Sequence, residues 1–313
     1  MQKLKDLKAL VSGTPLVEVK YKYNDNINFI YAKCEWFSLT GSIKDKVALQ
    51  IFLDAYSQKQ LKKGDRIVEV SSGNMGLAIS AIGNLLGNPV KIIMPRSMSE
   101  ERKKLIRLYG ATLVEADNFR HAFTLQENFI KQGYFSTGQF SNLSNVKVHK
   151  EITAKEIFDK IKNKKVKAFV SGVGTGGTLV GVGSVLKEKL NLKVFAIEPF
   201  NARLLSGQKP FLHHKIQGVS DEIVPDLYDK NIVDKIIPIK DEDAIAMSQK
   251  LAKVLSLGVG ISSGANFIGA VLSQRTCVTV FADDNKKYLS TDLSSPVSTP
   301  LVDAIDLLDV RVL

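Results

Sequence analysis

Three short polar segments of the sequence combine residue types that bind anions with positions at the start of helical patterns. They are "SSGN" (71–74), "GTGGT" (174–178) and "ISS" (261–263). Free backbone amides and the dipole at a helix start attract a phosphate or carboxylate, and hydroxyl and amide side chains add further donors. For each segment alone, ordinary helix capping explains the same residues.

The second segment also completes a G-x-G-x-x-G pattern through Gly172, Gly174 and Gly177. Glu198 follows about twenty residues later, where a dinucleotide-binding protein has the acid that binds a ribose. A glycine turn before a helix accommodates any phosphate, however. The pattern therefore predicts a phosphate site without identifying the ligand.

Lys44 stands between the small polar segment "SLTGSI" and the helical pattern "KVALQIFLDAYSQ". A single lysine is usually a surface charge, so the position of Lys44 alone assigns it no role.

The composition indicates a globular protein with 44% hydrophobic residues and a formal net charge of +11. The positive charges form short runs without interleaved aromatic residues, so no nucleic-acid partner is expected. The longest charge-free run, 168–186, contains six glycines, which does not suit a membrane span, and no signal peptide is apparent. Cys34 and Cys277 are too few for a disulfide framework or a thiolate metal site, so buried thiols and a reducing cytoplasm are expected.

Short apolar runs alternate with helical patterns, which is typical of parallel α/β proteins. The sequence predicts helices at 76–86, 99–109 and 122–132 in the first half. It predicts strands at 66–70, 91–95, 112–116, 167–172, 193–199, 235–240 and 277–284. We expect two three-layer α/β domains, a large one formed by 1–44 plus 151–313 and a smaller one formed by 45–150.

Six motifs in this order resemble the cysteine synthase and cystathionine β-synthase family, which is related to the tryptophan synthase β subunit. They are "GSIKDK", "SSGNMG", "GVGTGGT", "HKIQGVSDEIVP", "GISSGA" and "YLSTDL". The resemblance covers the chain from "TPLVEV" to about Leu293. It implies a pyridoxal-phosphate enzyme with the cofactor in the cleft between two α/β domains.

The resemblance also implies roles for individual residues. Lys44 would form the Schiff base with pyridoxal phosphate, Asn74 would hold the 3′ oxygen of its ring, and Ser263 would face the ring nitrogen. The cup for the cofactor phosphate would be Gly174, Thr175, Gly176, Gly177 and Thr178. The substrate would be bound by Ser71, Ser72, Asn74, Met75, Gln139, Gly218 and Ser220.

Two departures from the family pattern bear on the reaction. Met75 replaces the usual threonine, and the segment "SDE" brings Asp221 and Glu222 to a loop that in the family lines the mouth of the active site. A carboxylate there would repel incoming hydrosulfide, but it could act as a general base. We therefore favour desulfhydration of L-cysteine through an aminoacrylate, with Asp221 as base and water addition giving serine.

Several alternatives remain open at this point. Both acids could simply face solvent or pair with a lysine. The family reaction of O-acetylserine with sulfide to give cysteine is one alternative, and thiol exchange of the cystathionine or lanthionine type is another. An NAD-dependent dehydrogenase is disfavoured, because the four histidines match no hydride-transfer arrangement. The resemblance also implies a homodimer, whereas no metal and no membrane are expected.

Overall fold

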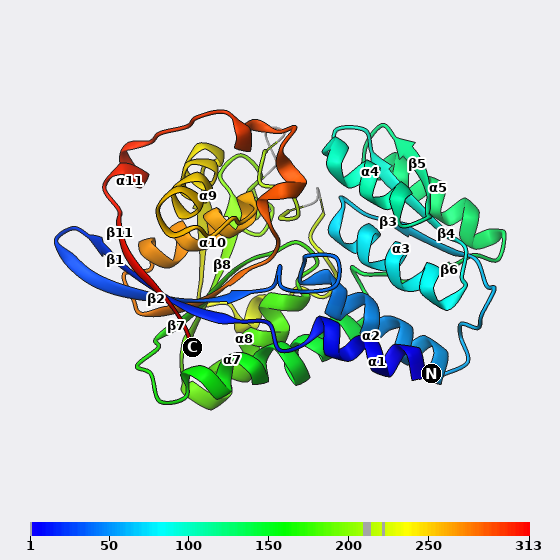
Figure 1. The fold of residues 1–313 in the computed structure, drawn as a ribbon, viewed down its shortest axis with the longest axis horizontal. Coiled ribbons are helices and arrows are strands. Elements are labelled where there is room, and N and C mark those ends of the chain that lie inside the picture. The colour runs from blue at the N-terminus through cyan, green and yellow to red at the C-terminus, as the bar shows by residue number, and fades with distance from the viewer. Residues whose placement is uncertain (1, 209–213, 221–222) are drawn as a thin grey trace.

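The computed structural model describes residues 2–208, 214–220 and 223–313, which form two β-sheets with helices on both faces (Figure 1). The larger sheet has the order β11-β1-β2-β10-β7-β8-β9. Its strands are β1 (Leu16–Tyr23), β2 (Asn26–Cys34), β7 (Ala168–Gly172), β8 (Lys193–Pro199), β9 (Lys235–Ile239), β10 (Cys277–Phe281) and β11 (Asp306–Val312). The strands from β2 to β9 in this order run parallel, whereas β1 is antiparallel to both β2 and β11.

Alternating side chains of the larger sheet enter two hydrophobic clusters, one on each face. Val170 and Ile197 point to the cluster shared with α9 (Asp241–Leu255) and α10 (Ile261–Leu272). Phe169 and Ala196 point to the opposite cluster, which contains α7 (Ala154–Ile161) and α8 (Gly177–Leu190). The sheet is therefore the middle of three layers (Figure 1).

The smaller sheet is entirely parallel and has the order β5-β4-β3-β6. Its strands are β3 (Ile67–Val70), β4 (Val90–Pro95), β5 (Thr112–Ala116) and β6 (Phe135–Ser136). Helices α2 (Lys44–Ser57), α3 (Asn74–Leu86) and α4 (Glu100–Leu108) contribute to one cluster, and α5 (Phe119–Lys131) contributes to the cluster on the other face. The predicted α/β class with mainly parallel sheets is thus confirmed.

Shorter elements complete the described chain. Helix α1 (Gln2–Val11) packs Leu4 and Leu7 with α2 and α3 rather than on the larger sheet. The remaining elements are α6 (Leu143–Val148), the π-helical turn η1 (His149–Thr153), α11 (Pro300–Asp303) and the 3-10 turns η2 (Lys230–Ile232), η3 (Asn285–Tyr288) and η4 (Asp292–Ser294). The division of the chain into domains at 44 and 151 stays a prediction.

Both cysteines are buried and unpaired, as expected, at the end of β2 and the start of β10. Burial raises the pKa of each thiol, Cys34 and Cys277, to about 12. Within the three ranges that the structure describes, no helix has the length and apolar character of a membrane span. No group of histidine, cysteine and acidic side chains suited to a metal ion occurs in those ranges either.

Candidate active site

Two adjoining cavities meet at Lys44, between the two sheets. The glycine-loop cavity, about 50 Å³, is lined by residues of the β7–α8 loop and the start of α10. The serine-loop cavity, about 40 Å³, is lined by residues of the β3–α3 loop. The residues common to both walls are Ile43, Lys44, Thr175, Gly218, Ser262 and Ala282.

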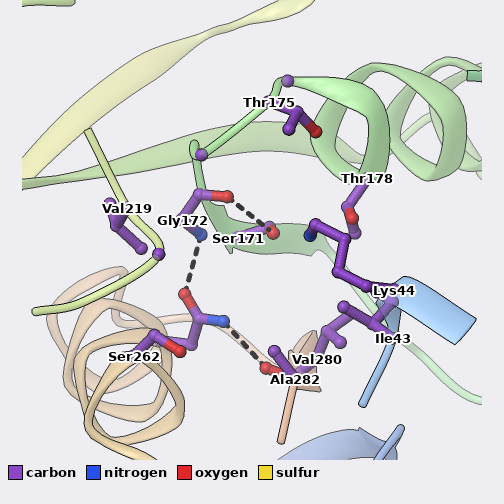
Figure 2. Close-up of a pocket in the computed structure, with 14 residues that line it drawn as sticks. Ile43, Lys44, Ser171, Gly172, Thr175, Thr178, Val219, Ser262, Val280 and Ala282 are labelled. Atoms are coloured by element: carbon purple, nitrogen blue, oxygen red, sulfur yellow. Dashed lines mark hydrogen bonds between the residues drawn. The ribbon is translucent and has the colours of Figure 1, made fainter. Parts of the chain in front are cut away.

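Lys44 is the first residue of α2 and is half-buried. Figure 2 shows its side chain entering the glycine-loop cavity towards Ser171, with Val219 and Ser262 on the opposite wall. Its backbone N–H donates to Ser42 Oγ at 3.3 Å. The amine therefore lies where a ligand in either cavity can reach it.

A buried ion cluster fixes the first turn of α2, which carries Lys44. Lys46 Nζ lies 2.8 Å from a carboxylate oxygen of Glu35, the residue after β2, and 2.8 Å from one of Glu156 on α7. Lys33 Nζ lies 2.8 Å from the same oxygen of Glu156. Two lysines and two acids balance the charge, so the cluster ties α2 to the larger sheet without leaving a net buried charge.

The loop from Gly174 to Thr178 has the geometry of an anion cup. A Cβ atom at Gly174 would lie 2.3 Å from the Gly218 carbonyl oxygen, and one at Gly177 would lie 2.0 Å from Asn145 Oδ1. Gly176 has φ +84°, which favours glycine. The loop leads directly into the N-terminus of α8, whose first amides have no partners within the helix.

Hydroxyl groups complete this cup. Thr175 Oγ1 accepts a hydrogen bond from Asn145 Nδ2 at 2.9 Å, and Thr178 Oγ1 lies 3.2 Å from His149 Nε2. Gly174, Thr175, Gly176 and Thr178 line the cavity, whereas Gly177 is absent from its wall and serves close packing against Asn145. Four of the five predicted phosphate residues thus lie together on one wall.

His149 is fully buried behind the cup, with Nδ1 3.0 Å from Thr153 Oγ1. Burial, and then the nearby Lys44 and Lys46 cations, hold the pKa of His149 well below its usual value. A neutral imidazole has one donor and one acceptor nitrogen, so it can orient Thr178 without adding charge.

The serine loop was predicted to bind the substrate carboxylate, and Ser71, Ser72, Asn74 and Met75 all line the second cavity. Ser71 Oγ accepts hydrogen bonds from the N–H groups of Gly73 (3.0 Å) and Gly76 (2.9 Å). Ser71 thus shapes the start of α3. Met75 is buried and adds an apolar surface to the wall where the family has a threonine.

Gln139, predicted from the motif "GQFSN", lines the same cavity and donates through Nε2 to the Val70 carbonyl at 2.8 Å. The sequence analysis did not identify Glu69, the residue that binds the backbone of the turn at 137–139. Glu69 on β3 accepts from Thr137 N (3.1 Å), Gly138 N (3.1 Å) and Gln139 N (3.4 Å). Burial raises the pKa of Glu69, although these hydrogen bonds oppose the rise.

The structure corrects the place given to the serines of "GISSGA". They lie within the first turn of α10, which begins at Ile261, rather than before it. Ser262 lines both cavities. Ser263 is absent from both walls, is fully buried, and accepts a hydrogen bond from Ala282 N at 3.1 Å. The role of Ser263 at the cofactor ring stays a prediction, and Ala282, to which Ser263 is hydrogen-bonded, lines both cavities.

Gly218 lies on the wall of both cavities. Ser220 adopts φ +57°, donates from its N–H to the Val173 carbonyl at 2.8 Å, and is absent from both walls. Asp221 and Glu222 lie outside the described residues.

Glu198, the acid of the dinucleotide pattern, is buried at the end of β8. Its carboxylate accepts hydrogen bonds from the N–H groups of Leu205 (3.0 Å) and Ser206 (3.3 Å). Because its oxygens serve the chain itself, they do not form a ribose site.

Asn266 is a further residue that the sequence analysis missed. It lines the glycine-loop cavity, where its Oδ1 accepts from Gly172 N at 2.7 Å and its Nδ2 donates to the Val280 carbonyl at 2.8 Å, as the dashed lines in Figure 2 show. The motif "SSGAN" contains it, but an asparagine inside an apolar helix gives no signal by itself. Arg102 and Gln217, both on the wall of the serine-loop cavity, were missed as well.

The combined site fits pyridoxal phosphate. The cup offers backbone amides and two threonine hydroxyls to a phosphate, and Lys44 offers an amine to an aldehyde. Asn74 Oδ1 is buried without a partner within the described residues, as expected for a side chain that faces a bound group. The carboxylate of an amino acid fits the adjoining serine loop.

Fold and site together define an α/β enzyme that uses pyridoxal phosphate to act on amino acids. The model of the family described as pyridoxal-phosphate dependent enzyme matches residues 7–283, and the chain belongs to this family. It is similar to the cysteine synthase of Staphylococcus aureus, with 36% identity covering 93% of this chain and 97% of that protein. Cysteine synthase B of Campylobacter jejuni is 38% identical, covering 91% and 96%.

Solved structures extend the comparison. A hydrogen sulfide-producing enzyme from Fusobacterium nucleatum is 43% identical, with a TM-score of 0.95 and coverage of 100% of this chain and 99% of that one. An aspartate-to-asparagine variant of that enzyme was solved in complex with an alpha-aminoacrylate intermediate. O-acetylserine sulfhydrylase isoform 3 from Entamoeba histolytica is 36% identical with a TM-score of 0.85, covering 95% and 94%.

Proposed function

We propose that this protein converts L-cysteine and water into L-serine and hydrogen sulfide. The observation that carries the proposal is the similarity over the whole chain to a hydrogen sulfide-producing enzyme, at 43% identity. The cysteine synthases are less similar, at 36 to 38%. The acidic segment that carries Asp221 supports the same direction, because a carboxylate disfavours an incoming hydrosulfide anion.

The reaction balances with groups that this chain provides. Pyridoxal phosphate, when bound, withdraws electrons from the α-carbon of an amino acid and allows loss of the Cα proton and the Cβ substituent. Lys44 Nζ takes the Cα proton, the Cβ–S bond breaks with its electron pair on sulfur, and the departing hydrosulfide takes a proton from solvent to give hydrogen sulfide. Asp221 takes a proton from water as the new Cβ–O bond forms and releases it to solvent, and Lys44 returns its proton to Cα.

The walls of the two cavities support this assignment. Lys44 lies at their junction, so one amine can serve both the cofactor and the substrate α-carbon. Ser72 and Gln139 line the cavity proposed for the substrate carboxylate. Ser263 is proposed to face the ring nitrogen, with Ser262 beside it on the walls of both cavities. A neutral serine does not hold the ring protonated, which favours prompt loss of the leaving group over long-lived charge on the ring.

Replacing Asp221 by asparagine tests its role as a base. We expect steady sulfide release from cysteine to fall at least about 100-fold, the usual contribution of general base catalysis. If Asp221 activates water, the variant still releases one sulfide per site in a single turnover; if it assists departure of the thiol, even this first release is slow. Glu222→Gln is the matched control and should keep near wild-type rates. A fully active Asp221→Asn enzyme would contradict the role.

The synthesis of cysteine from O-acetylserine and sulfide is the second candidate, and the cysteine synthases of two bacteria favour it. Thiol exchange of the cystathionine or lanthionine type shares the first half of the reaction. These candidates differ in the nucleophile that enters at Cβ. Mass identification of the amino acid formed from cysteine in water labelled with heavy oxygen distinguishes them, because only hydration places the label in serine.

We also propose a homodimer located in the cytoplasm. Phe37 and Val312, both more than half exposed, border a groove of about 410 Å³ that includes Trp36 and Pro15, and a second copy of the chain could cover this apolar surface. The two unpaired, buried cysteines fit a reducing compartment. Sedimentation at about the 34.5 kDa mass of one chain would overturn the dimer, and cell fractionation tests the location.

A further inference from the structure

A buried carboxylate lies immediately behind the wall of both cavities and has no part in the reaction described above. Asp283 is fully buried and follows Ala282, which lines both cavities. Its Oδ2 accepts hydrogen bonds from Asn74 Nδ2 and from the Tyr288 hydroxyl, each at 2.8 Å. Arg102 NH2 lies 3.5 Å from the same oxygen.

The hydrogen bond between Asn74 and Asp283 connects residues beside the smaller sheet with residues of the larger sheet. Asn74 and Arg102 belong to α3 and α4 beside the smaller sheet, whereas Asp283 follows β10 of the larger sheet and Tyr288 ends η3. Asn74 and Asp283 are 209 residues apart in the sequence. No sequence motif contains both residues.

A carboxylate partner determines whether an asparagine amide presents its nitrogen or its oxygen. An ionised carboxylate only accepts hydrogen bonds, so the Asn74 amide must present Nδ2 to Asp283. The amide nitrogen carries a second N–H, which is left for a group in the serine-loop cavity that Asn74 lines. Without the carboxylate, the amide could rotate by half a turn and present its oxygen instead.

We propose that Asp283 is a positioning residue that fixes the Asn74 amide with an N–H directed at the 3′ oxygen of bound pyridoxal phosphate. The proposal rests on the proposed function, since it requires Asn74 to contact the cofactor. Asp283 itself acts only through Asn74.

Arg102 and Tyr288 hold the Asp283 carboxylate in place. Arg102 donates from NH2 to the Tyr288 hydroxyl at 2.6 Å, and its guanidinium lies over the Tyr288 ring with a distance of 4.5 Å to the centroid. Arg102 NH1 donates to Gln217 Oε1 and, at 3.3 Å, to the Ser72 carbonyl. The buried pair of opposite charges is thus supported by hydrogen bonds from both sides.

Gly73 permits this arrangement. A Cβ atom at Gly73 would lie 2.2 Å from Cδ and 2.6 Å from Nε of Arg102, and its φ of +153° is rarely adopted by other residues. The serine loop therefore packs directly on Arg102. The arginine reaches the carboxylate only because the residue before Asn74 has no side chain.

A double-mutant cycle on cofactor binding tests the proposal. The apoprotein of each variant is titrated with pyridoxal phosphate, and both the affinity and the visible absorbance maximum are measured. We expect Asp283→Asn to weaken binding roughly tenfold, as for loss of one hydrogen bond to a charged group, and to shift the maximum. In an Asn74→Ala background, Asp283→Asn should change neither the affinity for pyridoxal phosphate nor the absorbance maximum any further, because its effect passes through Asn74.

The control variant is Asp284→Asn. Asp284 is the adjacent acid, accepts from Lys286 N at 3.1 Å and is absent from both cavity walls, so binding should stay at the wild-type level. Should Asp283→Asn not fold, Tyr288→Phe replaces it in the cycle, with a smaller effect in the same direction that also disappears without Asn74.

Two results would overturn the proposal. One is an Asp283→Asn variant with the cofactor affinity and absorbance maximum of the wild type. If Asp283→Asn does not fold, the same result in Tyr288→Phe would overturn the proposal. The other is an effect of the same size with and without Asn74, which would indicate general support of the fold. A wild-type protein that binds no pyridoxal phosphate would instead refute the proposed function.

Discussion

At the scale of single residues, the site depends as much on absent side chains as on reactive ones. Gly174 and Gly177 leave space for the Gly218 carbonyl and for Asn145, and Gly73 leaves space for Arg102. These close contacts shape the loops around Lys44. Replacing any of the three glycines by alanine requires backbone or side-chain movement beside the cofactor.

The buried histidine behind the phosphate cup predicts a dependence of stability on pH. The folded-state pKa of His149 lies well below the usual value of about 6.5 that applies to the unfolded chain. Below that value the unfolded chain binds a proton that the folded protein does not. The contribution of buried, neutral His149 to the free energy of unfolding is therefore fully present above about pH 6.5. It is lost as the pH falls below that value, at about 1.4 kcal/mol per pH unit.

Urea unfolding of wild type and His149→Asn at about pH 7 and about pH 5 checks this prediction. Over this interval the free energy of unfolding should fall more for the wild type than for the variant. His121→Asn is the control, because His121 lies at the surface next to Asp117. Equal losses in wild type and His149→Asn would contradict the prediction.

The sequence predicted residues that stand in contiguous motifs and missed those that meet only in the fold. Lys44, Asn74 and four residues of the glycine loop line the two cavities, because each motif carries its own local geometry. Arg102 and Asp283 are ordinary charged residues in the sequence. They join the site because α4 and the segment after β10 lie together, which no local pattern reveals.

At the scale of elements, the buried parallel strands were predictable and the antiparallel ones were not. Strands β3, β4, β5, β7, β8, β9 and β10 begin within a residue or two of their predicted positions, because each is a short apolar run. Strands β1 and β2 form a hairpin without an intervening helix, so the alternation of strands and helices did not indicate them.

The C-terminal strand β11 pairs with β1, so the end of the chain packs on its own sheet rather than extending away from it. Leu307 is 8% exposed and lies in the cluster beneath α9, whereas Leu308 is 46% exposed on the other face. We expect Leu307→Ala to lower the free energy of unfolding by about 2 to 3 kcal/mol, the usual loss for a buried leucine. Leu308→Ala should change it by less than about 0.5 kcal/mol.

Denaturant unfolding of the two leucine variants measures the difference. The two substitutions have the same size and occur at neighbouring positions, so each serves as the control for the other. A larger loss for Leu308→Ala would mean that β11 pairs one residue out of register, because such a slip exchanges the two faces of a strand.

At the scale of the whole molecule, the reactive groups come from both sheets. Lys44 and the serine loop lie beside the smaller sheet, and the glycine loop and Ser262 belong to the larger one. Any relative movement of the two parts changes the distance between the phosphate cup and the substrate loop. Such an arrangement can exclude water until the substrate is bound, then admit it for the second step.

The central claim is that the protein consumes cysteine and releases sulfide. The most direct measurement supplies the purified wild-type protein, loaded with pyridoxal phosphate, with L-cysteine alone or with O-acetylserine plus sulfide, and follows sulfide and amino acids in both reactions. We predict that cysteine alone yields sulfide and serine in equal amounts, and faster than the second mixture yields cysteine. Rapid synthesis of cysteine with no sulfide released from cysteine alone would contradict the account.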